Sequence, residues 1–464
     1  MTKQEFPTKV IQFGEGNFLR AFVDWMIDIL NEKNAFNGSV AVVQPLENGL
    51  VQMLAEQNCH YHHVRQGLEG GQKIDEIRKI TSISKAVNPY KDTRSYFELA
   101  EAPEVQLVFS NTTEAGIVFD EKDQPTDGQI ASSFPGKLTQ LLKQRFDHFN
   151  ADESKGLAVV PCELIEQNGT KLKQCVNQYI QLWGLGGAFQ NWVDNSCSFA
   201  NTLVDRIVPG YPKEEIETLL DRIGELDKLV VKSEAFHLFV IQAEDYVKEL
   251  FPAHQHGLNV KYVSDITPYR TQKVRILNGA HTSMVPIGLL YGLETVSETI
   301  DDPETGKLIN ELIYDEIVPT ISIPGEDPKE FADAVINRFQ NPFIRHELIS
   351  ISLNSISKFK VRVLPTFKDY LKHTGELPKR MTFSLACLLK LYTSGQFDLK
   401  DDQNILNFFD TIKVLNTDTL VQKALSNSEL WGEDLTSIEG LTEQVIEHFE
   451  SISSSAMKEA IYNI

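Results

Sequence analysis

Short, mainly apolar runs alternate with amphipathic stretches through roughly the first 255 residues. Four runs of four or five residues, each followed by glycine or small polar residues or by proline, predict buried strands at 9–13, 40–43, 105–109 and 157–160. Helical periodicity follows at about 21–30, at 134–146 and from about 169. Strands that alternate with helices predict an α/β domain, a mainly parallel sheet with helices on both faces.

The pattern changes near residue 256, and long helical periodicities dominate from there to the end of the chain. We therefore expect two domains, residues 1–255 and 256–464, the second mostly α-helical and separated from the first by a cleft that holds the active site. The expected helices of the second domain lie at 273–290, 328–340, 341–357, 382–392, 403–416, 418–427 and 440–452.

The first predicted strand runs into Gly14-Glu15-Gly16-Asn17-Phe18, and a predicted helix follows. A strand, a Gly-x-Gly turn and a helix are typical of the opening of a Rossmann-type dinucleotide-binding unit, because glycines let the backbone approach a pyrophosphate. Leu19 replaces the third glycine of the usual pattern, so an ordinary tight turn fits this half-motif about as well. Gly14, Gly16, Asn17 and Phe18 are the candidate cofactor-binding residues.

Polar residues at the ends of two later strands extend this hypothesis. Gln44 follows the second strand, where an acidic residue commonly binds the ribose of NAD. Gln44 can hydrogen-bond a hydroxyl, and no Arg or Lys follows at once to hold a 2′-phosphate, which favours NAD over NADP. Asn111 and Thr112 follow the third strand, at the end of the sheet where open α/β folds bind ligands.

A second candidate cluster begins the helical region. On an α-helix with about 100° per residue, His281 lies about 80° and Asn278 about 140° from Lys273, whereas Arg275 lies on the far side. A lysine that exchanges a proton, beside an amide and an imidazole, suits chemistry at a carbinol or carbonyl carbon. The alternative is an amphipathic helix whose polar face is merely solvated.

The composition of the chain limits the kinds of partner that it can bind. A net charge of −21 and a pI near 5.0 make the chain a poor general binder of nucleic acid or anionic membrane. No apolar run approaches the roughly 20 residues of a membrane helix, and residues 1–7 lack the apolar core of a secretory signal. Five cysteines without a C-x-x-C pair fit free thiols in a reducing cytoplasm.

The cluster Cys59-His60-Tyr61-His62-His63 is the strongest candidate for a metal site. In a strand, however, its side chains alternate between two faces, and no later group completes a ligand set. We therefore expect a half-exposed strand and no metal.

The segment that contains Lys273, Asn278 and His281 resembles a motif of the mannitol dehydrogenase family, whose members are long-chain, metal-independent polyol and sugar-acid dehydrogenases. Family-like blocks also occur at 14–21, 134–138 and 199–209, in the family's order. The resemblance implies a Rossmann-type N-terminal domain, a helical C-terminal domain and nicotinamide-dependent hydride transfer at a secondary alcohol. It also implies that Lys273 is the acid/base, Asn278 binds the oxyanion and His281 hydrogen-bonds the substrate. The motif is Lys273-x-Arg275-x-Leu277-Asn278-Gly279-x-His281.

Three departures from the mannitol-specific pattern bear on the substrate. Leu164 stands where mannitol enzymes have an oxyanion-binding Asn, Arg270 replaces a Glu, and His237 is new. With the Pro-Cys-Glu-Leu-Ile block at 161–165, these residues most resemble the tagaturonate-reducing branch, which implies a sugar-acid substrate. Its carboxylate needs a local cation or donor. The candidates are Arg270, His237 and Lys358, the last because the family has a substrate-contacting lysine nearby.

Four alternatives remain open from the sequence. Within the family these are a fructuronate reductase and a mannitol-type polyol 2-dehydrogenase. A zinc-dependent polyol dehydrogenase would need a ligand set that we do not find. A non-catalytic nucleotide-binding regulator would keep the glycine turn without needing Lys273, Asn278 and His281 together. The sequence makes no prediction of oligomeric state.

Overall fold

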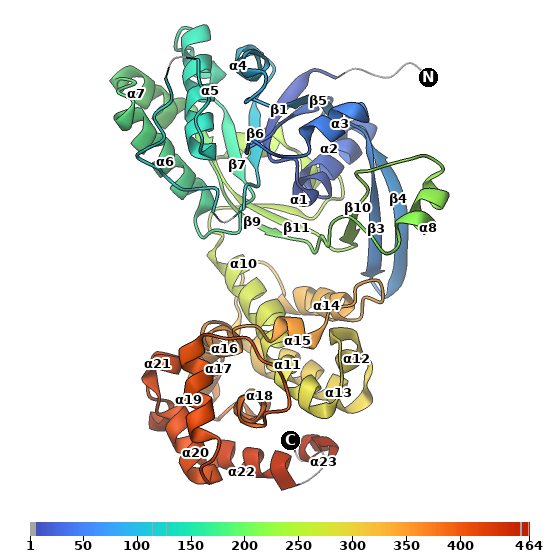
Figure 1. The fold of residues 1–464 in the computed structure, drawn as a ribbon, viewed down its shortest axis with the longest axis vertical. Coiled ribbons are helices and arrows are strands. Elements are labelled where there is room, and N and C mark those ends of the chain that lie inside the picture. Colours follow the sequence, from blue (N-terminus) through green and yellow to red (C-terminus); the bar gives the residue numbers. More distant parts are fainter. Residues whose placement is uncertain (1–5, 114, 127, 455–456, 463) are drawn as a thin grey trace. The chain divides into compact units, whose positions relative to one another are not determined.

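The computed structural model describes residues 6–113, 115–126, 128–454, 457–462 and 464 (Figure 1). The chain divides into two units. The first comprises Met1–Gln66 and Ile74–Ile266, and the second comprises Gly67–Lys73 and Thr267–Ile464. No helix in the described ranges is long and apolar enough to cross a membrane.

The first unit is built on a six-stranded, all-parallel sheet with the order β5-β2-β1-β6-β7-β8. In the order in which these strands follow one another along the chain, this is 3-2-1-4-5-6, the order of the dinucleotide-binding α/β fold. The predicted Rossmann-type domain is therefore confirmed. The strands are β1 (Thr8–Phe13), β2 (Ser39–Val43), β5 (Ile83–Val87), β6 (Leu107–Ser110), β7 (Ala158–Pro161) and β8 (Ser198–Phe199).

Alternation of side chains along the strands produces a core on each face of this sheet. Val10 of β1 packs into one core, and its neighbours Ile11 and Phe13 pack into the other. The first core is covered by α2 (Val23–Glu32) and α3 (Val51–Glu56). The helices over the second core, grouped together in Figure 1, are α4 (Thr93–Glu101), α5 (Phe134–His148), α6 (Asn168–Leu182) and α7 (Gly187–Ser196).

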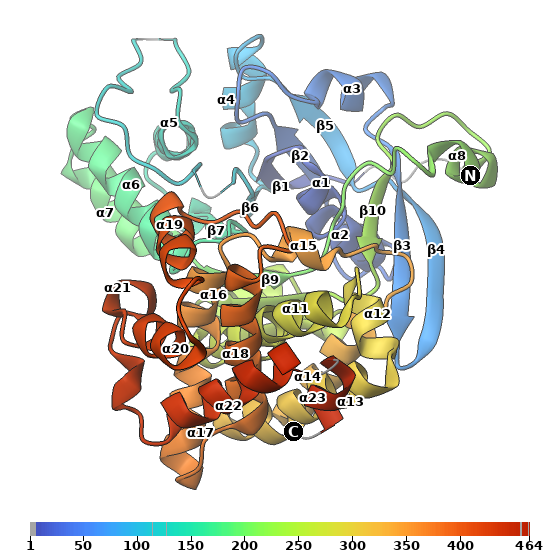
Figure 2. The same ribbon diagram turned by 60° about the horizontal axis from the view of Figure 1, so that its bottom comes forward.

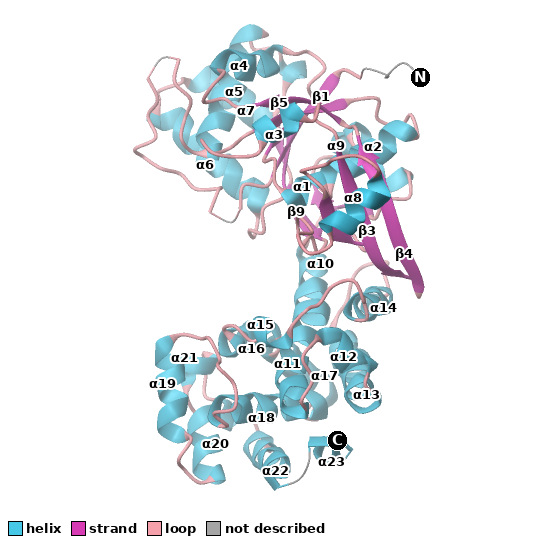
Figure 3. Cartoon of the chain, turned by 45° about the vertical axis from the view of Figure 1, so that its right-hand side comes forward, coloured by secondary structure: helices cyan, strands magenta, loops and turns pink. Residues whose placement is uncertain are grey.

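Two three-stranded sheets complete the first unit, and their strands are drawn in magenta in Figure 3. A strand is present near residues 59–63, since β3 begins at Tyr61. The prediction that it is half-exposed is wrong: β3 is the middle strand of its sheet, and Tyr61, His62 and His63 are buried. The strands of the first of these sheets are β10 (Val231–Glu234), β3 (Tyr61–Glu69) and β4 (Gln72–Ile80). Those of the second are β12 (Val260–Val263), β11 (Leu238–Gln242) and β9 (Asn201–Asp205). The remaining α-helices of this unit are α1 (Asn17–Arg20), α8 (Ile216–Ile223) and α9 (Asp245–Leu250).

The second unit is helical, as predicted, and Figure 2 shows its helices, with α18 packed against α11 and α22. Two segments, η3 (Lys273–Gly279) and η4 (Leu312–Ile317), are π-helical. The α-helices are α10 (Thr267–Gln272), α11 (Ala280–Tyr291), α12 (Val296–Asp301), α13 (Pro303–Glu311), α14 (Pro328–Phe339), α15 (Leu348–Ile351), α16 (Ser355–Arg362), α17 (Leu364–Thr374), α18 (Lys379–Thr393), α19 (Gln403–Ile412), α20 (Thr417–Leu425), α21 (Ser428–Trp431), α22 (Leu441–Ser454) and α23 (Met457–Tyr462).

The predicted helix at 341–357 is wrong. Residues 341–347 are not helical, α15 is a single turn, and α16 begins only after Asn354. Asn354 has a φ of 56°, a left-handed conformation that an α-helix does not contain. Pro342 also disfavours a helical conformation for the residue before it. The apolar residues of this segment therefore belong to two short helices, α15 and α16, rather than to one long helix.

Candidate active site

A hollow of about 340 Å³ lies at the carboxyl ends of β1 and β6, where the strand order reverses. Open α/β sheets bind ligands at this topological switch point. We call this hollow the switch-point pocket. Its lining residues are Gly14, Glu15, Gly16, Pro45, Leu46, Asn111, Thr112, Thr113, Ala115, Gly116, Val118, Asp120, Ser132, Ser133 and Phe134.

The glycine turn after β1 forms one wall of the pocket. Gly14 has a φ of +117°, and a Cβ atom there would lie 2.7 Å from the carbonyl oxygen of Asn111, so the turn requires glycine. At Gly16 an added Cβ would meet no atom within 4 Å. Arg20 stabilises the turn through two hydrogen bonds. Its Nε donates to the carbonyl oxygen of Glu15 at 3.1 Å, and its guanidinium donates to Asn17 Oδ1 at 2.7 Å.

The loop after β6 forms the opposite wall and is anchored by Glu163. The buried Glu163 carboxylate accepts hydrogen bonds from the Ser110 hydroxyl at 3.0 Å and from the Thr112 backbone N–H and hydroxyl, each at 2.9 Å. Burial raises the pKa of Glu163, and these donors oppose that shift. Leu164, which stands where the mannitol enzymes have an oxyanion-binding Asn, is 62% exposed. Asn111 and Thr112 are thus held in the pocket wall by the block at 161–164.

Three other predicted cofactor-binding residues lie outside the set that lines the pocket. The Gln44 amide donates to the carbonyl oxygens of Leu46 at 2.8 Å and Glu47 at 2.9 Å, and its Oε1 accepts from the Val51 N–H. Asn17 contacts Arg20, and Phe18 stacks on the ring of Phe22, the residue just before α2. Direct cofactor contacts by Gln44, Asn17 and Phe18 remain predictions.

The predicted catalytic helix begins as the π-helical segment η3 rather than as an α-helix. Because a π-helix bonds residue i to residue i+5, five residues complete slightly more than one turn. Lys273 and Asn278 therefore lie on the same side of η3, closer in angle than the 140° that α-helical geometry predicts. Both residues are half-buried. Arg275 instead pairs with Asp369 at 2.6 Å.

His281 lies in the first turn of α11 and is buried. Its ring packs against Phe339, with centroids 4.3 Å apart, and against His346 at 5.0 Å. Burial and the neighbouring positive charges lower the pKa of His281 well below its ordinary value, so the imidazole is neutral at physiological pH. Its Nε2 has no hydrogen-bond partner in the described part of the chain. A buried, unpaired nitrogen is the kind of group that a bound ligand satisfies.

Basic residues surround this imidazole, and the charges of Arg338, Arg362 and Lys358 all act on it. Arg338 is buried, and Lys358 Nζ donates to the Ile351 carbonyl oxygen at 2.8 Å. Arg362, at the end of α16, is half-buried and forms no ion pair within the described ranges, and burial lowers its pKa. Arg338 and Arg362 were not predicted as site residues, although the basic stretch at 358–362 was a signal.

The other two predicted substrate residues have different surroundings. Arg270 is half-buried on α10, about one turn before Lys273. His237 Nε2 accepts a hydrogen bond from the Asn259 N–H at 2.9 Å, and the ring packs edge-on against Trp25. Burial, with nearby arginines, lowers the pKa of His237 to about 3. This neutral histidine is held by neighbours within the first unit, and its contact with the substrate remains a prediction.

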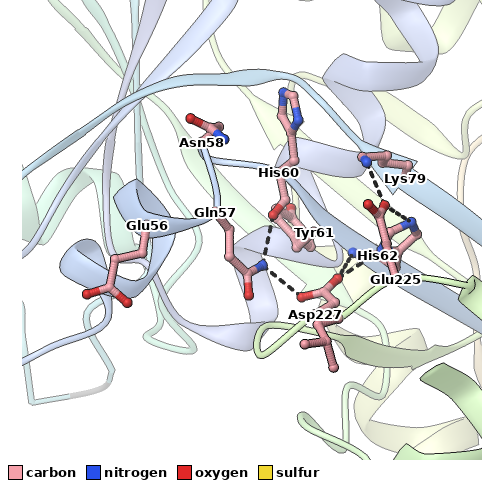
Figure 4. Close-up of a pocket in the computed structure, with 10 residues that line it drawn as sticks. Glu56, Gln57, Asn58, His60, Tyr61, His62, Lys79, Glu225 and Asp227 are labelled. Atoms are coloured by element: carbon pink, nitrogen blue, oxygen red, sulfur yellow. Dashed lines mark hydrogen bonds and ion pairs between the residues drawn. The ribbon is translucent and has the colours of Figure 1, made fainter.

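A second hollow, of about 290 Å³, lies beside β3 and contains none of the predicted site residues (Figure 4). His62 Nδ1 lies 2.9 Å from Asp227, and its Nε2 lies 3.4 Å from Glu225, which also pairs with Lys79. These polar groups satisfy one another. Within the described ranges, no three His, Cys, Asp or Glu residues are arranged to hold a metal ion, and metal independence remains a prediction.

Comparisons with known proteins give the chain its relatives. Residues 8–252 match the mannitol dehydrogenase Rossmann domain, and residues 265–453 match the mannitol dehydrogenase C-terminal domain. The altronate oxidoreductase of Phocaeicola vulgatus is 45% identical over 100% of this chain and 98% of its own length. That of Bacillus subtilis is also 45% identical, over 98% of this chain and 95% of its own length.

The fold is likewise similar to a solved structure, the Pseudomonas fluorescens mannitol 2-dehydrogenase in a ternary complex with NAD and D-mannitol. The two chains are 20% identical with a TM-score of 0.67, and the match covers 100% of this chain and 95% of the other. With both domain models and full-length relatives in agreement, this chain belongs to the mannitol dehydrogenase family.

Proposed function

We propose that this chain catalyses the NAD-dependent interconversion of D-tagaturonate and D-altronate. The observation that carries the proposal is its 45% identity, over essentially its full length, to proteins named altronate oxidoreductase. The switch-point pocket and the cluster of Lys273, Asn278 and His281 support the same reaction class. We also propose that the reaction takes place in the cytoplasm, which the five free, buried cysteines support.

The switch-point pocket fits a nicotinamide dinucleotide. Its glycine turn leaves room for a backbone approach at Gly16, and apolar side chains of Leu46, Val118 and Phe134 line the remaining wall. Gly14, Gly16, Asn111 and Thr112 would hold the cofactor there. When bound, the reduced cofactor supplies the hydride that converts the ketone into a secondary alcohol.

Lys273 acts as the general acid in reduction and gives a proton to the carbonyl oxygen as negative charge develops there. Its neutral amine takes the same proton back in the oxidative direction. Asn278, on the same side of η3, donates its amide N–H to the developing oxyanion. The π-helical spacing places both groups on one side, so they can serve the same oxygen atom.

His281 and the surrounding cations bind the substrate. The buried Nε2 of His281 hydrogen-bonds a substrate oxygen, which gives this nitrogen the partner that the described residues do not provide. Arg362 and Lys358 hold the sugar-acid carboxylate, with Arg270 one turn before Lys273 as a further contact. A chain with a net charge of −21 repels anions in general, so these local cations are what would admit this substrate.

The direct test is to incubate the purified chain with D-tagaturonate and NADH and to follow NADH absorbance and the sugar product. We expect NADH to be consumed in equal amount to the D-altronate formed, and the reverse reaction with D-altronate and NAD. Cofactor binding without turnover of any ketose or keto-acid would contradict the proposal and would favour the nucleotide-binding regulator.

A further inference from the structure

We propose that Glu15 selects NADH over NADPH by binding the hydroxyls of the adenosine ribose. In dinucleotide-binding folds an acidic residue at the end of the second strand commonly has this role. Here the acid comes instead from the glycine turn after the first strand. This inference rests on the proposed use of a nicotinamide cofactor and names the residue that discriminates between its two forms.

The structure places the Glu15 carboxylate at the end of β2. Glu15 lines the switch-point pocket and is 8% exposed, and its Oε1 accepts a hydrogen bond from the backbone N–H of Leu50 at 3.1 Å. A Cβ atom added to Gly49 would lie 2.1 Å from Glu15 Oε1 and 2.7 Å from Gln44 Cδ. The carboxylate of Glu15 therefore lies beside Gln44, the residue that directly follows β2.

Gln44 cannot easily take the role itself. Its amide nitrogen donates to two carbonyl oxygens of its own loop, and its amide oxygen accepts from the Val51 N–H. Glu15 Oε2, in contrast, receives no hydrogen bond from any other residue that the structure describes. One oxygen of Glu15 thus braces the loop at 45–50, and the other remains for a ligand.

Charge repulsion accounts for the discrimination between NADH and NADPH. A carboxylate accepts hydrogen bonds from two ribose hydroxyls, whereas it repels the 2′-phosphate of NADPH, and the repulsion is strong where water is partly excluded. Burial raises the pKa of Glu15, but hydrogen bonds from its own backbone N–H and from the Leu50 N–H, together with the charge of Arg20, favour its ionised form. The loop at 45–50 contains no Lys or Arg that could neutralise a 2′-phosphate.

The test measures dissociation constants of NADH and NADPH by fluorescence titration, without any sugar substrate. Glu15→Gln keeps the acceptor for Leu50 but removes the charge. We expect the variant to lower the ratio of the NADPH constant to the NADH constant by about tenfold or more. Competition by 5′-AMP and 2′,5′-ADP should show the same shift, since these fragments differ only in the 2′-phosphate.

Glu47→Gln is the matched control, because Glu47 is an exposed acid in the same loop and should leave the ratio unchanged. Gly49→Ala, whose methyl group would displace the carboxylate, should lower the ratio as Glu15→Gln does. If Glu15→Gln folds and binds NADH but keeps the wild-type ratio, Glu15 is only a brace and the inference is wrong. A wild-type chain that binds neither nucleotide would overturn both this inference and the proposed function.

Discussion

Lys273 carries the proton transfer in the proposed reaction, and it lies on η3 with Asn278 on the same side. We predict that Lys273→Ala lowers kcat roughly 10²–10⁴-fold, the usual contribution of a positioned acid/base. Affinity for NADH should be nearly unchanged, because the switch-point pocket belongs to the first unit. Stopped-flow and steady-state assays would measure the first effect, and fluorescence titration the second.

Lys307→Ala provides the control for this variant. Lys307 is an exposed lysine of α13 whose nearest acidic group, Glu311, lies on the same helix. Its replacement should leave kcat unchanged. A Lys273→Ala enzyme with near-normal turnover would remove Lys273 from the mechanism and leave the alternative of a solvated helix face.

Arg362 is the second residue whose role can be isolated. A hydrogen bond to a charged group is worth about 1.5–3 kcal/mol, so Arg362→Leu should raise KM for the sugar acid roughly 10- to 100-fold. A neutral ketose lacks the carboxylate, and its KM should change far less. Arg270→Ala should show a similar but separate difference between the acid and the neutral sugar. Equal effects on both substrates would exclude the replaced arginine from carboxylate binding.

The secondary structure shows which elements local pattern can predict. The four predicted strands of the main sheet and most of the long helices are present, because apolar runs and caps act over a few residues. The π-helical start of the predicted 273–290 helix was not predictable, since α and π turns share the same residue preferences over so few positions. The polar strand β4 was missed because five of its nine residues are exposed.

Helix α2 contains a buried acid whose ionisation should make stability depend on pH. Asp24 is fully buried, its Oδ2 accepts a hydrogen bond from Gln12 at 3.1 Å, and its Oδ1 has no partner in the described part of the chain. Burial raises the pKa of Asp24 to about 7. The contribution of Asp24 to stability is therefore greatest below pH 3.8, its ordinary pKa, and is lost as the pH rises towards 7, because the folded state resists ionisation of this group.

We predict that Asp24→Asn stabilises the protein by roughly 2–4 kcal/mol at pH 8 and by little at pH 4. Asparagine keeps an oxygen that can accept from Gln12 but never ionises. Denaturant unfolding of both proteins across this pH range measures the difference. A difference that stays constant with pH would show that Asp24 does not change ionisation on unfolding.

For the whole molecule, the sequence was sufficient to predict the fold class and the glycine-turn side of the pocket. The strand, the Gly14–Gly16 turn and the following helix lie within one short segment, and Asn111 and Thr112 directly follow a strand. Glu15 and Arg362 were not predicted as site residues, because their roles depend on contacts across the fold. Glu15 reaches Leu50, 35 positions away, and Arg362 lies 81 positions after His281.

The charge distribution of the whole chain bears on the substrate. The net charge is −21, yet the cations Arg338, Lys358 and Arg362 all act on the neutral imidazole of His281. Such a local concentration of positive charge favours an anionic sugar over a neutral polyol. The stereochemistry of the sugar, which separates tagaturonate from fructuronate, is supported by the named relatives and by the block at 161–165 rather than by charge.

The most direct test of the central claim is therefore a comparison of kcat/KM for D-tagaturonate, D-fructuronate and D-fructose with NADH, under one set of conditions. We predict the highest value for D-tagaturonate and the lowest for neutral D-fructose. A higher value for D-fructuronate would contradict the assignment of the stereoisomer but not that of a sugar acid. The highest value for D-fructose would contradict the central claim that this site recognises a carboxylate.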